Sequence, residues 1–246
     1  MNPGSQGSQV RPLDSIERRV LGVLIEKAKT TPDAYPLSLN AVVTGCNQKS
    51  NRDPVMTLDE EQVTRALDSL RASGAVAEVY GNGRLARYRH LAYEWLATDK
   101  EPPKEVVAIL GELLLRGAQT EGDLRGRASR MDPIADLDTL RTLLDSMAAR
   151  GLITWLSPPG RGRLLTHGLL TPEQLAKVQA KLGTALTAAA ASPPTAPPAE
   201  VPASPAAPKV AAEEPDESDS LRNRVAALEA TVEQLLARIA TLEEIL

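Results

Sequence analysis

Cysteine, histidine and phenylalanine are scarce in this 246-residue chain, which has one Cys, two His and no Phe. The single cysteine, Cys46, rules out an internal disulfide and a zinc site built from several cysteines. The two histidines, His90 and His167, leave little for histidine-based catalysis, and no metal-ligand spacing surrounds them. The sequence therefore predicts a non-enzymatic protein with no catalytic residue, no metal site and no cofactor.

Long apolar runs are also missing. No stretch approaches the roughly 18 consecutive apolar residues of a membrane-spanning helix. The first residues are polar and do not resemble a secretory signal. We therefore expect a cytoplasmic protein with no membrane partner.

Neither sign of charge is in large excess, because 28 Lys and Arg face 32 Asp and Glu. The distribution is uneven: residues 11–170 hold 22 basic and 21 acidic side chains, whereas the remainder holds 6 and 11. A nearly neutral body is weak support for nucleic-acid binding, for which a basic surface is expected. The acidic remainder indicates a different role for the rest of the chain.

Two segments of contrasting composition follow the body. Residues 186–220 are rich in Ala, Pro, Ser and Glu, lack the apolar side chains that offset ordering entropy, and are expected to form a disordered linker. Residues 221–246 carry apolar side chains at alternating spacings of four and three, which favours a parallel two-stranded coiled coil; a trimer and a helix packed on its own chain remain alternatives. The expected dimerisation positions are Leu221, Val225, Leu228, Val232, Leu235, Ile239, Leu242 and Leu246.

The body contains an internal repeat with an offset of 77 residues. Residues 67–76 (LDSLRASGAV) recur as residues 144–153 (LDSMAARGLI), and the same offset relates His90 to His167. This ungapped match indicates two copies of one supersecondary unit.

Each copy is expected to form three helices and a hairpin. Asp14 and Glu17 fit a capping box at the start of the first helix, and Thr57 with Glu60 fits one at the start of a third helix that ends at Gly74. The second copy is expected to have helices near 105–115, 120–127 and 137–150 and strands at 152–156 and 163–167.

This order is the plan of a winged helix, in which a hairpin wing follows the third helix. We therefore expect a mainly α protein with small β-hairpin wings. Its expected parts are a disordered N-terminus (1–12), two tandem winged-helix domains (13–98 and 99–170), a trailing helix (171–185), the linker (186–220) and the coiled-coil segment (221–246).

Two motifs in the body resemble the signature of the YceH-like family of bacterial proteins. Residues 46–55 read CNQKSNRDPV, and residues 113–127 read LLLRGAQTEGDLRGR. The resemblance covers about residues 13–170 and implies tandem winged-helix domains with no established activity and no catalytic residue to carry over. Where family members tend to have proline, this chain has Glu121.

Two function classes stay open. One is a transcription- or chromosome-associated protein that binds duplex DNA, with basic side chains of the wings and of loop 47–52 contacting phosphates. Acidic residues at the start of both third helices suit the helix dipole but would repel phosphates, which argues against deep insertion into a groove. The alternative is an adaptor that uses winged helices to dock a protein partner. The expected nucleic-acid-binding residues are Lys49, Arg52, Arg65, Arg84, Arg87, Arg89, Arg161 and Arg163.

Overall fold

The computed structural model describes residues 10–80, 85–98, 100–160 and 162–191. The chain divides into two units, Met1–Pro193 and Pro194–Leu246, and the second lies wholly outside the described residues. The expected coiled coil at 221–246, with its eight dimerisation positions, also lies outside them, as does the expected linker from residue 192 onward.

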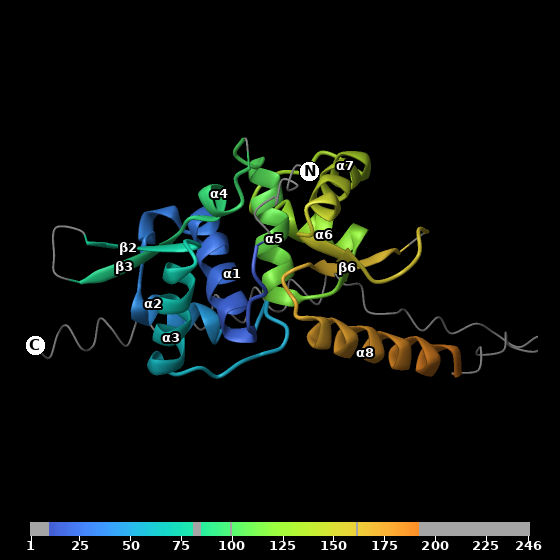
Figure 1. The fold of residues 1–246 in the computed structure, drawn as a ribbon, viewed down its shortest axis with the longest axis horizontal. Helices are drawn as coiled ribbons and strands as arrows, with labels where there is room; N and C mark the ends of the chain where they lie inside the picture. Colours follow the sequence, from blue (N-terminus) through green and yellow to red (C-terminus); the bar gives the residue numbers. More distant parts are fainter. Residues whose placement is uncertain (1–9, 81–84, 99, 161, 192–246) are drawn as a thin grey trace, which may run out of the picture. The chain divides into compact units, whose positions relative to one another are not determined.

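The first copy of the repeat folds as helix, strand, helix, helix, strand and strand (Figure 1). Its elements are α1 (Ser15–Thr30), β1 (Leu37–Ser38), α2 (Leu39–Cys46), α3 (Glu60–Ala72), β2 (Val76–Tyr80) and β3 (Ala86–His90), with a short 3-10 turn at Pro32–Ala34 after α1. The strands form an antiparallel sheet in the order β1-β3-β2. Strand β1 was not predicted, because two residues carry no alternation of their own and are defined by pairing with β3.

The second copy repeats this order with the same register. Its elements are α5 (Lys104–Arg116), β4 (Gln119–Thr120), α6 (Glu121–Ala128), α7 (Leu137–Ala149), β5 (Ile153–Trp155) and β6 (Leu164–His167). Val76 pairs with His90 in the first sheet, as Ile153 pairs with His167 in the second. The strand order β4-β6-β5 is also equivalent, so the fold confirms the duplication read from the sequence.

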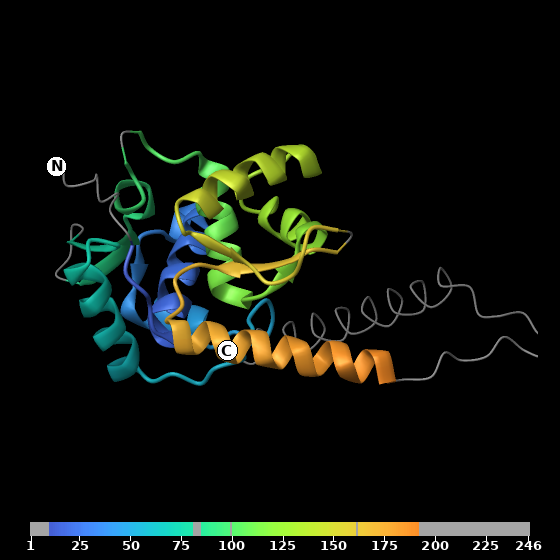
Figure 2. The ribbon, with the colours of Figure 1, turned by 45° about the vertical axis from the view of Figure 1, so that its right-hand side comes forward.

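Two further helices flank the copies. Helix α4 (Ala92–Trp95) follows the first sheet and was not predicted, whereas α8 (Pro172–Ala191) follows β6, as Figure 2 shows. The sequence predicted that this helix ends at residue 185, but α8 continues to Ala191. The start of the expected linker is rich in alanine, which has a high helix propensity. None of the helices among the described residues is both long and apolar enough to cross a membrane.

Helix starts follow their capping residues. The Asp14 carboxylate accepts the Glu17 backbone N–H at 2.8 Å, and the Glu17 carboxylate accepts the Asp14 N–H at 2.8 Å, which confirms the predicted capping box. The cap predicted for α3 was wrong, because Asp59 and Gln62 form the box there. Asp59 directly precedes the helical residues, so its carboxylate reaches the free N–H groups that Thr57 cannot.

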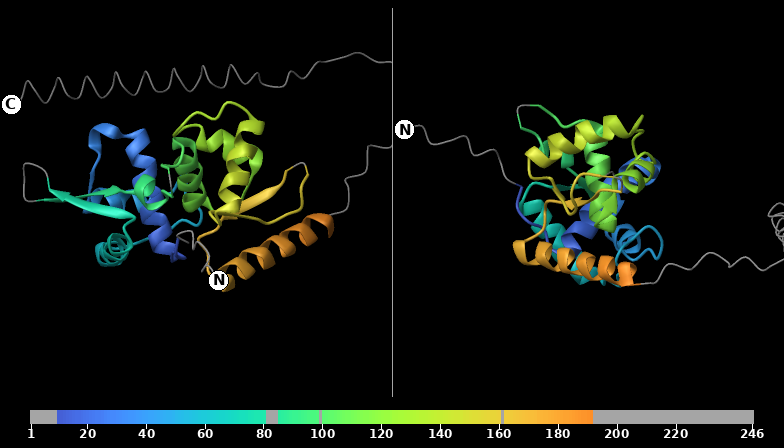
Figure 3. Two further views of the ribbon diagram at one scale, coloured as in Figure 1. Left: turned by 45° about the horizontal axis from the view of Figure 1, so that its top comes forward. Right: turned by 90° about the vertical axis from the view of Figure 1, so that its right-hand side faces the viewer.

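Helices α1 and α5 lie side by side and join the two copies (Figures 1 and 3). Residues 20–25 of α1 and 106–115 of α5 are buried without interruption. A helix in a single-layer contact buries only one stripe, so continuous burial means that α1 contacts both its own copy and the other one. The two copies therefore share one hydrophobic core.

Two glycines let these helices approach closely. A Cβ on Gly22 would lie 2.9 Å from the Leu115 side chain, and a Cβ on Gly111 would lie 2.6 Å from Cγ2 of Ile25. Each helix therefore supplies one glycine to the contact and receives a large side chain from its neighbour.

Residues ahead of α1 are also placed by specific contacts. The Arg11 guanidinium donates to both carboxylate oxygens of Glu17, at 2.7 and 3.1 Å, and to the Ser69 hydroxyl of α3. The Leu13 N–H donates to the Leu169 carbonyl at 3.0 Å, which ties the start of the first copy to the end of the second. The expected disorder through residue 12 is therefore wrong at residues 10–12, because Arg11 finds a carboxylate on the first turn of α1.

Candidate functional site

The hairpin of strands β2 and β3, the first hairpin, presents two arginines on one face. Ala77 pairs with Arg89 and Val79 with Arg87, so these four side chains share a face. Both arginines are exposed; Arg87 donates to the Pro36 carbonyl at 2.9 Å, and Arg89 lies 3.9 Å from the Glu94 carboxylate. The exposure expected of these two residues is therefore observed.

Helix α3 lies on the other face of the first hairpin. Glu78 shares its face with the buried Tyr88, and its carboxylate forms an ion pair of 2.7 Å with Arg71 of α3. Arg87 and Arg89, which point to the opposite face, therefore do not combine with α3 into one basic surface.

The exposed side of α3 is balanced in charge. Arg65 pairs with Glu61 at 2.7 Å, and Arg71 pairs with Asp68 at 3.1 Å in addition to Glu78. Arg65 is exposed, as expected, but its carboxylate partner lies one helical turn away. The first turn of α3 is acidic and would meet any phosphate with like charge.

The hairpin of β5 and β6, the second hairpin, holds its arginine differently. The Arg163 guanidinium stacks 3.4 Å above the centre of the Trp155 ring, and the side chain is half-buried. Arg84 and Arg161, the other wing arginines predicted to contact phosphate, lie outside the described residues. In Figures 1 and 3 the two hairpins point away from each other.

Two large apolar side chains are exposed at the ends of the first hairpin. Tyr80, at the end of β2, is 67% exposed, and Leu85, just before β3, is 79% exposed. Tyr80 shares its face with Glu78, and its hydroxyl donates to the Glu78 carboxylate at 2.7 Å, whereas Arg87 and Arg89 lie on the opposite face. Single exposed apolar side chains are common, but two large ones stand near the same end of this hairpin.

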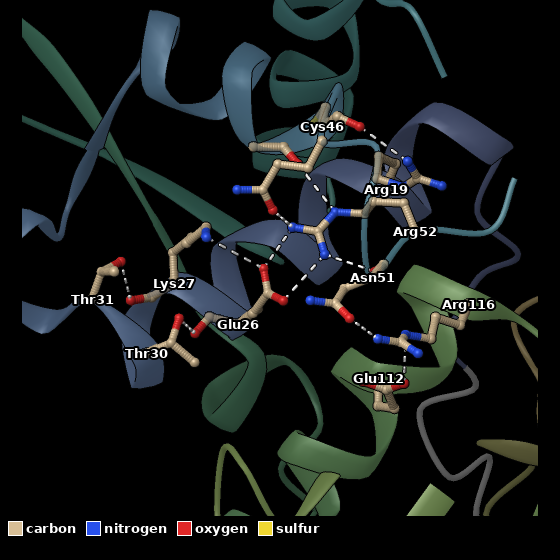
Figure 4. A network of polar contacts seen from close by, with 12 residues as sticks. Arg19, Glu26, Lys27, Thr30, Thr31, Cys46, Asn51, Arg52, Glu112 and Arg116 are labelled. Atoms are coloured by element: carbon tan, nitrogen blue, oxygen red, sulfur yellow. Dashed lines mark hydrogen bonds and ion pairs between the residues drawn. The ribbon is translucent and has the colours of Figure 1, made fainter. Parts of the chain in front are cut away.

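Arg52 is buried and does not face solvent, so its expected role in phosphate contact is wrong. Its guanidinium donates to both carboxylate oxygens of Glu26 on α1, at 3.1 and 2.6 Å, and to the Gly45 carbonyl at 3.1 Å (Figure 4). The Gln48 side chain and the Asn51 carbonyl accept further bonds. Lys49, in the same loop, is exposed.

The loop that carries the first motif connects the two copies. Arg19 of α1 donates to the Cys46 and Pro54 carbonyls at 3.0 and 2.5 Å, which fixes both ends of the motif. From the other side, Arg116 of α5 donates to the Asn51 side chain, and the Asp53 N–H donates to a carbonyl at the end of α5. The polar run 47–52 thus contributes to a junction between the copies, with Arg52 buried and residues 49–51 exposed.

Two neighbouring cavities open where this loop meets the second motif. One of about 280 Å³ includes Glu26, Asn51, Glu112 and Arg127 in its lining, and the other, of about 200 Å³, includes Asn51, Arg127 and Gln119. Motif residues 46–55 and 113–127 therefore meet around one set of cavities, which we call the junction site. Its full lining is Glu26, Lys27, Thr30, Gln48, Ser50, Asn51, Arg52, Asp53, Glu112, Arg116, Ala118, Gln119, Arg127, Arg130 and Met131.

Burial and like charge perturb the groups of the junction site. Burial raises the pKa of Glu112, whereas Arg116, Arg130 and Arg127 act to lower it. Burial lowers the pKa of Arg116; Glu112 opposes this, and repulsion by Arg127, Arg130 and Arg52 adds to it. Positive charge therefore accumulates around a single buried carboxylate of α5.

The two histidines and the cysteine are buried, and burial sets their protonation states. Burial lowers the pKa of His90 to about 4 and that of His167 to about 3, so both rings are neutral near pH 7. Burial raises the pKa of the Cys46 thiol to about 12, which leaves it protonated and a poor nucleophile. Within the described residues, no group of three or more His, Cys, Asp and Glu could hold a metal ion.

Together these features define a duplicated, mainly helical protein whose copies share a core and meet at a charged junction. The chain belongs to the family described as "Protein of unknown function, DUF480", whose model matches residues 13–160. This membership confirms the resemblance to YceH-like proteins, and both motifs lie within the matched region.

Similarity to curated relatives supports this membership. The UPF0502 protein RB6530 of Rhodopirellula baltica is 55% identical over 170 residues, which cover 69% of this chain and 70% of the relative. A UPF0502 protein of Acidovorax sp. is 37% identical over 244 residues, covering 96% and 98%. The UPF0502 protein GSU0233 of Geobacter sulfurreducens is 52% identical over 138 residues, and the match spans only 61% of its length.

Sequence reasoning missed the second side of the junction site. Glu112, Arg116 and Gln119 were not proposed as functional residues, although the last two stand inside the second motif. The available signal was that two motifs about 60 residues apart each combine arginines with amide side chains. Only the packing of α1 on α5 brings those motifs together.

Proposed function

We propose that this chain is a non-enzymatic tandem winged-helix protein that acts as an adaptor and docks a protein partner through its first hairpin. The winged-helix assignment is supported by the order helix, strand, helix, helix, strand, strand, which occurs twice with equivalent pairing. Winged helices serve both nucleic acids and proteins, so the partner class must come from the surface residues.

Four of the predicted phosphate-contacting residues are exposed, but they do not form one basic surface. Lys49 lies in the loop that carries the first motif, and Arg65 forms an ion pair with Glu61 on α3. Arg87 and Arg89 point away from α3. DNA binders need convergent cations, because affinity grows with the number of phosphates neutralised together. The acidic first turn of α3 further disfavours DNA as the partner.

The observation that carries the adaptor proposal is the exposed pair Tyr80 and Leu85 at the ends of the first hairpin. Aromatic side chains are frequent anchors at protein interfaces, and arginine is enriched beside them. Arg87 and Arg89 follow Leu85 along the chain and lie on the face opposite Tyr80, so the hairpin suits a partner that contacts both of its faces, with apolar side chains at its end and carboxylates along the Arg87 face. Electrostatic complementarity of this kind increases the association rate and the specificity.

Site-specific photo-crosslinking in cells tests the proposal. A photoreactive residue at position 85 is expected to trap one protein. The same residue at position 55 is the control and should not trap it, because Val55 is 56% exposed but lies in the first motif, away from the hairpin. With the trapped protein purified, Tyr80→Ser with Leu85→Ser should weaken binding by about tenfold or more, and Val55→Ser should leave it unchanged.

The same proteins decide between the two partner classes. The Kd for random duplex DNA is measured by fluorescence anisotropy at two salt concentrations, for the wild-type chain and for Arg87→Glu with Arg89→Glu. Salt-dependent binding that is lost in this variant, with no specific crosslink from position 85, would overturn the adaptor proposal in favour of DNA. Equal crosslinking from positions 85 and 55 would also contradict it.

A further inference from the structure

The junction site has more positive than negative charge. Five cationic side chains (Lys27, Arg52, Arg116, Arg127 and Arg130) and three carboxylates (Glu26, Asp53 and Glu112) line its two cavities. Glu26 forms an ion pair of 2.6 Å with Arg52, and the Glu112 carboxylate lies 3.1 Å from the Nε of Arg116. In the described part of the chain, no carboxylate lies within ion-pair distance of Arg127 or Arg130.

One residue that lines the smaller cavity carries a buried donor without an acceptor. Gln119 is buried, and its Oε1 accepts a bond of 2.7 Å from Arg127, which fixes the orientation of the amide. Its Nε2 has no hydrogen-bond partner among the described residues. A buried amide N–H with no acceptor is unfavourable, so an acceptor that reaches it would be stabilising.

Arg116, which also lines the smaller cavity, carries a second buried N–H. Its Nε lies at ion-pair distance from Glu112 but not in hydrogen-bond geometry, and among described residues neither atom has a hydrogen-bond partner. Arg127, Arg130 and Arg52 repel the Arg116 guanidinium, and Glu112 attracts it. An anion among these groups would relieve that repulsion and accept their free N–H donors.

We propose that the smaller cavity of the junction site binds a phosphoryl group, either free orthophosphate or the phosphate of a small monoester, through Arg127, Gln119 Nε2 and Arg116. A tetrahedral dianion accepts bonds from several directions, whereas a carboxylate accepts them in one plane. The cavity of about 200 Å³ has room for several waters at about 30 Å³ each, and hence for one phosphate. The bound anion would connect Arg116 of α5 and Gln119 of β4 to Arg127 of α6.

Orthophosphate is the probe, and the full chain is the protein tested. Calorimetric titration with sodium phosphate at constant ionic strength should give saturable binding, and the melting temperature should rise with phosphate as the bound form is stabilised. Arg127→Gln is expected to weaken binding at least tenfold. Arg65→Gln is the matched control, because it removes the same charge from exposed α3 outside the site, and it should bind like the wild type.

Two more variants distinguish a site from a change in fold. Gln119→Leu removes the free Nε2 donor together with the Oε1 acceptor of Arg127, and it should weaken binding by about tenfold. Glu112→Gln removes a competing carboxylate and should tighten binding severalfold, a result that simple loss of structure cannot produce.

The controls also identify the ligand. Sodium acetate at the same ionic strength should give no saturable binding, and a phosphate monoester should compete with orthophosphate if the group carries a substituent. Equal phosphate effects on Arg127→Gln and Arg65→Gln, or an equal response to acetate, would overturn the proposal and mean that the cavity holds only water. The hairpin plays no part in these measurements, so the outcome is independent of the proposed adaptor function.

Discussion

Arg52 and Glu26 form a two-bonded ion pair that fastens the first motif to α1. The guanidinium side chain is 0% exposed, and the distances from its Nη1 and Nη2 to the two carboxylate oxygens are 3.1 and 2.6 Å. Bonds to three backbone or amide oxygens occupy its remaining donors. The arginine is therefore satisfied inside the fold, and its role is to hold the loop against the helix.

Removing one partner of this pair should destabilise the protein strongly. Glu26→Gln leaves the Arg52 charge buried without its counter-ion, and the free energy of unfolding is expected to fall by about 3–5 kcal/mol. Glu61→Gln breaks the exposed pair with Arg65 and should cost less than about 1 kcal/mol. Urea unfolding of both variants measures the difference. Equal losses would mean that the buried pair has no special role.

Two helical glycines, one in the contact between α1 and α5 and one outside it, predict opposite effects of a Gly→Ala change. Gly111→Ala places a Cβ 2.6 Å from Ile25, so overpacking should lower the free energy of unfolding by about 1–3 kcal/mol despite the better helix propensity of alanine. Gly126→Ala, in α6, meets nothing within 4 Å and should raise it by about 0.5–1 kcal/mol. Thermal unfolding of the pair checks this, and a stabilised Gly111→Ala protein would refute the close contact.

The two buried histidines predict a loss of stability in mild acid. Both have a folded-state pKa below the unfolded value of about 6.5, at about 4 for His90 and about 3 for His167. Between these limits the unfolded chain binds more protons, so stability increases with pH and falls as pH drops below about 6.5. Each histidine contributes a slope of up to about 1.4 kcal/mol per pH unit in that window.

Urea unfolding of the wild-type chain and of His167→Gln, at about pH 7, 6 and 5, isolates this effect. The variant is expected to lose less stability per pH unit than the wild type, whatever its stability at pH 7. Parallel curves for the two proteins would show that His167 is protonated in the folded state or is not buried.

The heptad pattern at 221–246 stays a prediction, and sedimentation tests it. The full chain should sediment as a dimer, whereas a chain ending at residue 193, the end of the first unit, should sediment as a monomer. Leu235→Glu in the full chain should give the same result as the truncation, because Leu235 is one of the expected dimerisation positions and a charge there disrupts the apolar contact. Identical masses for full and truncated chains would reject the coiled coil.

The sequence predicted most of the fold because the repeat and the helix patterns are local signals. Three helices and a hairpin appear in each copy as expected, and those of the second copy lie near their expected residues, whereas β1 and β4 were missed because two-residue strands exist only through pairing with β3 and β6. The close approach of α1 and α5 was also missed. Nothing in the sequence relates Gly22 to Leu115 or Gly111 to Ile25 before the helices are packed.

The candidate site was harder to predict, because the location of a charge depends on distant partners. Arg87 and Arg89 are exposed as expected, since alternation along a strand fixes their face. Arg52 looked equally accessible in a polar run, yet its partner Glu26 comes from a helix 26 residues earlier. Loop polarity indicated contact with something polar but could not show that the contact was internal.

The continuous burial of α1 has a consequence for synthesis on the ribosome. Residues 20–25 leave the ribosome well before residues 106–115, which cover one of their sides. At a translation rate of about 5–20 residues per second, the apolar side of α1 that α5 later covers stays exposed for several seconds. Chaperones that bind nascent chains would contact this apolar side of α1 in that interval, until α5 is synthesised and packs against it.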